Sequence, residues 1–243
     1  MSDNIIEAKA IWKTLGHGAG KVQALRGVDL SLRRGELTLL MGPSGSGKTT
    51  LLLILGCMLT PSAGSLLVCG VSTANADKER LARIRREHIG FVFQSFHLFP
   101  TLTAAQNVQL ALDIRRERGR KARDKSREAL RSVGLEQKIR ARPLELSGGE
   151  QQRVAIARAI VADPSVVLAD EPTAALDTDN GQTIMRILAS IAHERQRAVL
   201  VVTHDPRVVP FADRIIRIED GHLVDESMDE PGRERTNVTV IGR

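Results

Sequence analysis

Residues 42–49 have the sequence Gly42-Pro43-Ser44-Gly45-Ser46-Gly47-Lys48-Thr49, and this stretch decides the fold. An apolar run at 37–41 leads into it, and a helix-like segment from Thr50 to Met58 follows it. A strand, a glycine loop and a helix in this order open the α/β fold of nucleotide-binding proteins. Gly-x4-Gly-Lys-Thr is the complete phosphate-loop pattern, and a glycine-rich turn without a ligand is the plainer alternative.

Each residue type in this loop suits a phosphorylated ligand. The glycines let the backbone curl so that successive N–H groups point at a β-phosphate, and the first helical turn, with Thr50, adds the positive end of its dipole. We expect Lys48 to reach the β- and γ-phosphates and the Thr49 hydroxyl to ligate Mg²⁺. The run from Gly42 to Thr50 is therefore the predicted nucleotide-binding loop.

An acidic pair follows a second apolar strand. The strand at 166–169 ends in Asp170 and Glu171. Because ligands of open α/β sheets lie beyond the carboxyl ends of the strands, both acids are expected to face the phosphate site. Asp170 suits the outer sphere of Mg²⁺, and Glu171 can polarise a water molecule for in-line attack on a γ-phosphate. A polar turn after a strand is the structural alternative.

A second glycine motif has the sequence Leu146-Ser147-Gly148-Gly149-Glu150. Ser147 with Glu150 three residues later forms a capping box, and this alone predicts a helix start. Two adjacent glycines in a first helical turn cost stability, however. Close approach of the bare amides of Ser147, Gly148 and Gly149 to an anion would explain them.

The remaining pattern divides the chain into a core and an insertion. Residues 77–87 and about 103–162 are predicted to be mostly helical. Strands are predicted at 5–12, 28–32, 198–203 and 214–218, and a helix at 179–195. The fold class is therefore α/β, with core segments 1–92 and 166–225 and a helical subdomain at about 93–165. Residues 226–243 are predicted to form a flexible C-terminal tail.

Composition excludes several classes of protein. The chain has 243 residues, of which 42 % are hydrophobic and 26 % charged, so wholesale disorder is excluded. Its longest apolar run is about half a membrane span, and it opens without a secretory pattern. Cys57 and Cys69 fit no disulfide framework, which favours a reducing compartment. We therefore expect a soluble intracellular protein.

The net charge of +6 does not by itself indicate a nucleic-acid partner. The basic runs 80–86 and 115–127 are mixed with acids, as on solvated helix faces. One Trp, five Phe and no Tyr leave too few rings for base-stacking surfaces. No nucleic acid is expected as a partner.

Taken together, these motifs resemble the ATP-binding cassette of ABC transporters, over about residues 5–225. The loop at 42–49 matches Walker A, 146–150 matches the signature motif, and 166–171 matches Walker B. The matching single residues and short motifs are Gln94 for the Q-loop, Ala175-Leu176-Asp177 for the D-loop and His204 for the switch histidine. The resemblance implies a P-loop cassette at 1–225 with a RecA-like core and a mixed sheet.

The resemblance also implies a mechanism. Two copies would close head to tail around two ATP molecules, each site combining one Walker A loop with Ser147 and Gly149 of the other copy. Glu171 would act as the catalytic base, His204 would contact the γ-phosphate, and Lys48 would bind it. Gln94 would ligate Mg²⁺, together with Thr49 and Asp170, and signal to a membrane permease. The chain would then lie peripherally on the cytoplasmic face of the cell membrane.

Finer features are similar to the macrolide-export, lipoprotein-release and DevA-type members, which implies export or lipid extrusion. Examples are Leu55-Gly56-Cys57 and the segment 85–91. Two departures stand out. The usual adenine-stacking aromatic position is Leu15, so either Leu15 supplies apolar contact alone or Trp12 or His17 adapts. Glu150 replaces the commoner Gln, and both can close the capping box.

Residues 94–100 are the predicted docking surface for a permease helix, and Phe96, Leu98, Phe99 and Pro100 are its apolar members. Ordinary packing inside the helical subdomain is the alternative. Two other functions remain open from the motifs. The chain could regulate a membrane complex, such as a cell-division assembly, without transport. It could instead act on ribosomes or DNA, although it has one cassette and lacks a coiled coil.

Overall fold

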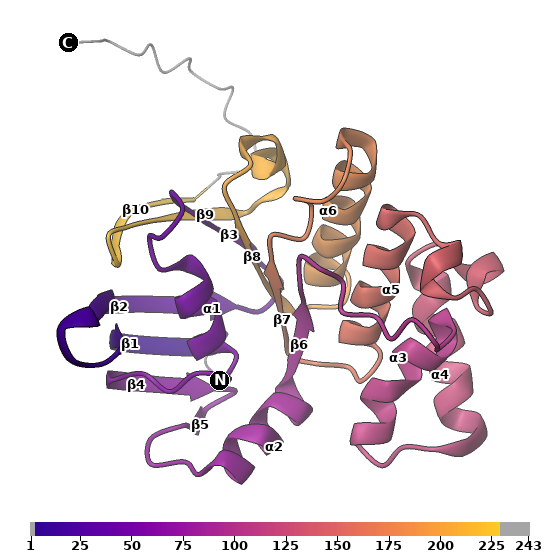
Figure 1. Ribbon diagram of the computed structural model, residues 1–243, viewed down its shortest axis with the longest axis horizontal. Coiled ribbons are helices and arrows are strands. Elements are labelled where there is room, and N and C mark those ends of the chain that lie inside the picture. Colours follow the sequence, from indigo (N-terminus) through magenta and orange to yellow (C-terminus); the bar gives the residue numbers. More distant parts are fainter. Residues whose placement is uncertain (1–2, 229–243) are drawn as a thin grey trace.

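The computed structural model describes residues 3–228, which form two sheets and a group of helices (Figure 1). The first sheet is antiparallel and has four strands in the order β2-β1-β4-β5. Its strands are β1 (Asn4–Leu15), β2 (Val22–Arg33), β4 (Ala63–Val68) and β5 (Val71–Ser72). Only β1 and β2 are long, and they pair along almost their whole length.

The second sheet has six strands in the order β10-β9-β3-β8-β7-β6. Its strands are β3 (Leu37–Met41), β6 (Ile89–Val92), β7 (Val166–Asp170), β8 (Ala198–Thr203), β9 (Arg214–Glu219) and β10 (His222–Met228). All neighbours are parallel except β9 and β10, which are antiparallel. The carboxyl ends of β3, β7 and β8 therefore meet at one edge, where parallel sheets place their ligands.

Within residues 3–228, six α-helices surround the sheets. They are α1 (Lys48–Leu55), α2 (Lys78–His88), α3 (Ala104–Ile114), α4 (Gly119–Ser132), α5 (Gly148–Ile160) and α6 (Thr178–His193). In Figure 1, α3, α4 and α5 gather on the far side of β6 from the antiparallel sheet, and α6 lies between them and β8. Short 3-10 segments connect these elements, at 18–20, 136–138, 143–145 and 206–211.

The core has two parts because the central strands are buried on both faces. On β3, Leu37 and Leu39 face the cluster that contains α3 to α6, whereas Leu40 faces α1 and the antiparallel sheet. This alternation follows from the two-residue period of a strand. Helix α1 is consequently packed between the two sheets, and the loop that precedes it is held at the edge formed by β3, β7 and β8.

The strong apolar strands and the long helices are where the sequence pattern predicts them, and the α/β fold class is confirmed. The pattern missed β4, β5, β6 and β10, of which β5, β6 and β10 lie at sheet edges. Strand β10 continues to Met228, three residues into the predicted tail at 226–243, and the rest of that tail lies outside the described residues. Within residues 3–228, none of the helices has both the length and the apolar character that a membrane crossing requires.

Candidate active site

The loop at 42–49 leads into α1 through Gly47, whose φ of +105° only glycine adopts readily. A Cβ on Gly47 would also lie 2.5 Å from the carbonyl oxygen of Ala24. Unlike α2, α3, α5 and α6, which are capped by Asp77, Thr103, Ser147 and Asp177, α1 has no side-chain cap. Its first amides are therefore left for an anion, and the helix dipole favours one there.

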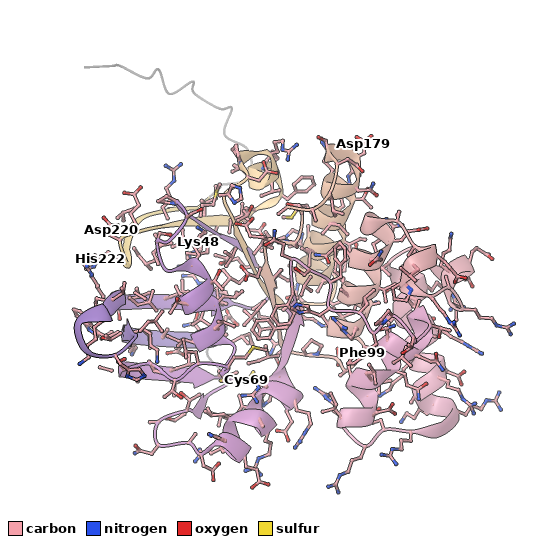
Figure 2. The ribbon with its side chains drawn as sticks, viewed as in Figure 1. Lys48, Cys69, Phe99, Asp179, Asp220 and His222 are labelled. Atoms are coloured by element: carbon pink, nitrogen blue, oxygen red, sulfur yellow. The ribbon has the colours of Figure 1, made fainter. Side chains whose placement is uncertain are left out.

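A cavity of about 420 Å³ opens beside this helix start. It is lined by Leu15, Val22, Gln23, Ala24, Arg26, Gly45, Gly47, Lys48, Thr49, Thr50, Asp220 and Gly221. Figure 2 marks Lys48 and Asp220 on this side of the molecule. Leu15 and Val22 are both exposed at the cavity. Trp12 instead packs on Gly27, and neither Trp12 nor His17 lines the cavity, so Leu15 remains the candidate for base contact.

Lys48 is buried, and its ammonium group is already engaged by the loop itself. Nζ donates to the carbonyl oxygens of Gly42, at 2.7 Å, and Pro43, at 2.8 Å. Burial lowers the pKa of Lys48, while the nearby carboxylates of Glu171 and Asp170 oppose this shift. An arriving phosphate would offer stronger, charged acceptors than these carbonyls.

Asp170 at the end of β7 meets Thr49 at the start of α1. The Thr49 hydroxyl donates to Asp170 Oδ1 at 3.3 Å. Burial raises the pKa of Asp170, the Thr49 hydrogen bond opposes the shift, and the charge of Glu171 reinforces it. A divalent cation would relieve this burial of negative charge. Mg²⁺ prefers oxygen ligands, and it usually combines one or two protein groups with phosphate oxygens and water. The hydroxyl of Thr49 and the carboxylate of Asp170 therefore fit this ion.

Glu171 and His204 form a pair at the ends of adjacent strands β7 and β8. Glu171 Oε1 lies 2.8 Å from His204 Nδ1. Glu171 has φ +46°, and its N–H donates to the Val202 carbonyl, which fixes the turn. A non-glycine residue in this region is strained, and such strain concentrates at functional sites. The Glu171 side chain is 16 % exposed and that of His204 is 68 % exposed, so the pair opens to solvent on the histidine side.

The second glycine motif forms the predicted capping box. Ser147 Oγ accepts from the Glu150 amide, and Glu150 Oε2 accepts from the Ser147 amide at 2.8 Å. A structural reason for one glycine was missed, however. A Cβ on Gly149 would lie 2.4 Å from Oδ1 of Asn180, which is bonded to Asp177. Anion binding is therefore not needed to explain Gly149, although Ser147 stays exposed.

The structure brings together some of the predicted site residues and leaves others apart. Thr49, Asp170, Glu171 and His204 are linked at the sheet edge beside the loop at 42–50. The run 147–149 does not line the cavity at Lys48. Gln94 is exposed, and no hydrogen bond of its side chain is present in the described part of the chain. Its role at Mg²⁺ stays a prediction.

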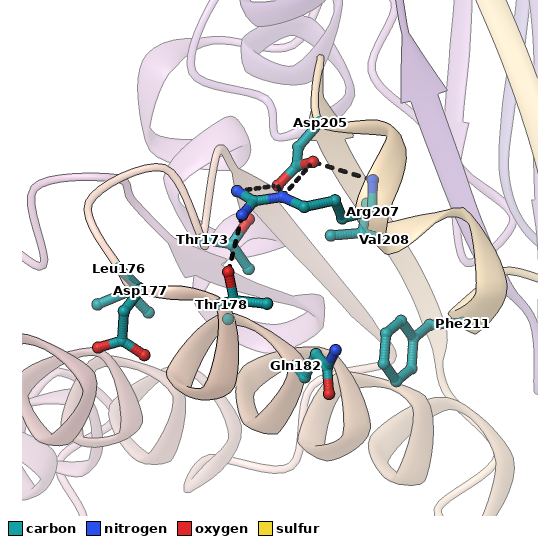
Figure 3. Close-up of a pocket in the computed structure, with 10 residues that line it drawn as sticks. Thr173, Leu176, Asp177, Thr178, Gln182, Asp205, Arg207, Val208 and Phe211 are labelled. Atoms are coloured by element: carbon teal, nitrogen blue, oxygen red, sulfur yellow. Dashed lines mark hydrogen bonds and ion pairs between the residues drawn. The ribbon is translucent and has the colours of Figure 1, made fainter.

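A polar bridge that the sequence did not indicate lies beside this site (Figure 3). Arg207 Nε donates to both carboxylate oxygens of Asp205, at 2.9 and 3.0 Å, and Nη1 donates to Thr178 Oγ1 at 3.0 Å. Asp205 follows His204, and Thr178 follows Asp177. The bridge therefore joins the chain after His204 to the start of α6. The position of Asp205 directly after His204 is the one sequence signal that could have indicated this bridge.

The chain is similar to known proteins along most of its length. Residues 25–174 match the family model described as ABC transporter. An uncharacterised ABC transporter ATP-binding protein, MJ0796 of Methanocaldococcus jannaschii, is 43 % identical over 223 residues, which are 90 % of this chain and 95 % of that protein. The macrolide export ATP-binding/permease protein MacB of Escherichia coli K12 is 41 % identical over 97 % of this chain. The chain spans only 36 % of that MacB.

Solved structures of ATP-binding cassettes have the same fold as this chain. A dimeric post-hydrolysis state of the MJ0796 cassette bound to ADP and Pi has a TM-score of 0.84 and 41 % identity, covering 92 % of this chain and 98 % of that one. The cbiO1 protein of Clostridium perfringens, part of a cbiONQ transporter complex, also has a TM-score of 0.84, at 28 % identity over 93 % and 89 % of the two chains. The resemblance found in the motifs is confirmed, and the chain belongs to the ABC transporter family as an ATP-binding cassette.

Proposed function

We propose that this cassette binds and hydrolyses ATP as the motor subunit of an exporter, with the described residues in the roles that follow. The observation that carries the proposal is the junction of an uncapped helix start at Lys48 with Asp170, Glu171 and His204. A phosphate cradle and a carboxylate base at one sheet edge are the parts that phosphoryl transfer needs.

The chemistry follows from the positions of these side chains. Lys48 leaves the carbonyls of Gly42 and Pro43 and donates to phosphate oxygens instead. Glu171 accepts a proton from the attacking water, whose oxygen bonds to the γ-phosphorus while the bond to the β–γ bridging oxygen breaks, giving ADP and phosphate. His204 holds the Glu171 carboxylate in place. Mg²⁺, held by Thr49, Asp170 and Gln94, would supply neutralisation of phosphate charge.

A second copy of the chain supplies the run 147–149. In one copy these residues do not line the Lys48 cavity, and the N-terminus of α5 has an exposed serine hydroxyl to offer. The MJ0796 cassettes, similar over nearly their whole length, are dimers in two solved structures. A head-to-tail pair would place Ser147 of one copy against the nucleotide of the other.

The permease partner is proposed to bind a groove of about 700 Å³ beside β6 and α3. Phe99 and Ile114 are exposed there, whereas Leu98 is partly buried against the helical core. Of the residues in the predicted docking surface, Phe99 is therefore the more available for a partner. Among the described residues, the groove is lined by Arg86, Arg115 and Arg158 and by a single acid, Asp113. A short helix with apolar residues and a carboxylate is the occupant that fits this charge.

Export as the direction, and the cytoplasmic membrane face as the location, are supported by the MacB relatives, whose names join an ATP-binding part to a permease. Recruitment can be measured with inside-out membrane vesicles from a strain that expresses the native partner. Phe99→Asp should abolish binding of the purified chain and leave its basal ATPase rate unchanged. Equal recruitment of the unmodified chain and of Phe99→Asp would refute the groove as the docking site.

Hydrolysis itself is tested with purified protein, Mg²⁺ and ATP. Lys48→Ala should lose ATP binding and hydrolysis together, because the buried cation is the main phosphate contact. Asp124→Asn, on the exposed face of α4, should change neither and serves as the control. A Lys48→Ala protein that hydrolyses ATP at the unmodified rate would contradict the assignment.

A further inference from the structure

Two residues after Gln94 the backbone enters the left-handed region, with positive φ, at two successive non-glycine residues. Phe96 has φ +58° and His97 has φ +48°. Phenylalanine does not enter this region easily, and two such residues in succession are rarer still, so the surroundings must hold the conformation. We call residues 95–97 the post-Gln94 segment.

Arg158, near the end of α5, holds both of these residues. Its Nη1 donates to the carbonyl oxygen of His97 at 2.5 Å, and its Nη2 donates to that of Phe96 at 2.7 Å. Two nitrogens of one planar guanidinium thus join two successive carbonyls in the fixed fork geometry of arginine. The contact therefore links the loop that follows β6 to α5 of the helical subdomain.

This arginine has no carboxylate partner among the described residues. Its hydrogen bonds go to neutral carbonyls, and burial alone lowers the pKa of Arg158 below its ordinary value. The side chain is half-buried at the wall of the groove, and its two hydrogen bonds to the post-Gln94 segment fix its position.

The same segment also touches the other end of α5. A Cβ on Gly148 would lie 3.9 Å from Cζ of Phe96, so the phenyl ring lies beside the first residue of the helix. Arg158 is ten residues farther on, roughly 15 Å along the axis at 1.5 Å per residue. The post-Gln94 segment therefore lies along the helix that carries Ser147 at its N-cap.

We propose that Arg158 is a positioning residue that fixes the post-Gln94 segment to α5, so that Gln94 and Ser147 move as one unit. This rests on the proposed function, in which Gln94 ligates Mg²⁺ and Ser147 contacts the nucleotide of the other copy. Movement of α5 toward that nucleotide then carries Gln94 with it. Loss of the link frees Gln94 while leaving the rest of the site intact.

The link can be tested without any catalysis, by hydrogen exchange on the full chain. The amides of Phe96 and His97 donate to the carbonyls of Phe93 and Ser95. In Arg158→Met, which keeps the length of the side chain and removes its donors, they should exchange at least about tenfold faster, while the amides of α5 exchange as before. Arg186→Met, on α6, is the matched control, since among the described residues Arg186 donates a hydrogen bond to Gln182 of its own helix. Unchanged exchange at Phe96 and His97 would overturn the proposal.

The functional consequence is tested by the Mg²⁺ concentration that gives half-maximal hydrolysis at saturating ATP. Arg158→Met should raise this Mg²⁺ concentration about tenfold, as loss of an outer-shell partner of a metal site does. Gln94→Ala should raise it similarly, and the double variant should be no worse than Gln94→Ala alone. Additive effects would overturn the proposal. If the unmodified chain hydrolyses no ATP, the proposed function fails, and the exchange experiment still decides the link.

Discussion

His204 Nδ1 lies 2.8 Å from Glu171 Oε1, although the two residues are 33 positions apart in the chain. Parallel pairing of β7 with β8 creates this proximity, because both strands end at the same edge of the sheet. The histidine thus orients the proposed base even without a nucleotide. A carboxylate held in one direction is better prepared to accept a proton than a freely rotating one.

We predict that His204→Ala will slow hydrolysis by about 10²- to 10³-fold, the usual cost of removing one positioned polar group from an active site. The affinity for ATP should change by less than about threefold, because the loop at 42–50 remains whole. Turnover and equilibrium binding measure the two effects separately. His222→Ala, on β10, is the control. If His204→Ala lost ATP affinity and turnover to the same extent, His204 would contribute to ATP binding rather than to the orientation of Glu171.

Base contact through Leu15 predicts a gain of affinity on adding a ring. Leu15→Tyr should bind ATP about 3- to 10-fold more tightly, since stacking adds roughly 0.5–1.5 kcal/mol. Trp12→Leu should leave the dissociation constant unchanged, because Trp12 packs on Gly27 outside the cavity. Titration with ATP, ADP and inorganic triphosphate checks this. A gain that triphosphate shares would show that the ring does not contact the base.

The two signature glycines should respond differently to alanine. At Gly149 the added Cβ would lie 2.4 Å from Asn180 Oδ1, whereas at Gly148 the nearest atom, on Leu176, is at 3.5 Å. We expect Gly149→Ala to lower the free energy of unfolding by about 1–3 kcal/mol, as overpacking does. Gly148→Ala should fold with almost unchanged stability. Addition of Asn180→Ala should restore part of the loss at Gly149. Equal stabilities of the two single variants would contradict the packing argument.

Stability should fall in alkaline solution because of Cys57. Burial raises the pKa of its thiol from 9.0 to about 11, with the charge of Arg85 opposing the shift. Between pH 9 and 11 the unfolded chain releases this proton while the folded chain keeps it, so rising pH favours unfolding. The loss approaches about 1.4 kcal/mol per pKa unit. Urea unfolding of Cys57→Ala should lack this slope, and Cys69→Ala should retain it. The same slope in Cys57→Ala would refute the assignment.

The sequence predicts those parts of the fold that are strongly periodic. The apolar strands at 166–169 and 198–203 lie where expected because strands buried on both faces have continuous apolar runs. Strand β6 was missed since Gly90 interrupts its pattern, and its register with β7 depends on long-range pairing. Strand β10 was missed because it is a polar edge strand. Edge strands carry little apolar signal.

The candidate site was predictable in its residues and only partly in its geometry. Local motifs identified Lys48, Asp170 and Glu171 without any knowledge of the fold. The contact of Gly149 with Asn180 and the attachment of residues 96 and 97 to Arg158 join segments that are distant in the chain. Such contacts depend on tertiary packing, and a single sequence carries no signal for them.

The central claim is that Glu171 is the base of an ATP site completed by a second copy. The most direct measurement is the mass of Glu171→Gln by size-exclusion light scattering, with and without ATP. The amide cannot accept the proton, so ATP should stay bound and a dimer should accumulate, while Glu171→Gln combined with Ser147→Arg should remain monomeric. A Glu171→Gln chain that binds ATP, hydrolyses it at the unmodified rate and stays monomeric would contradict the claim.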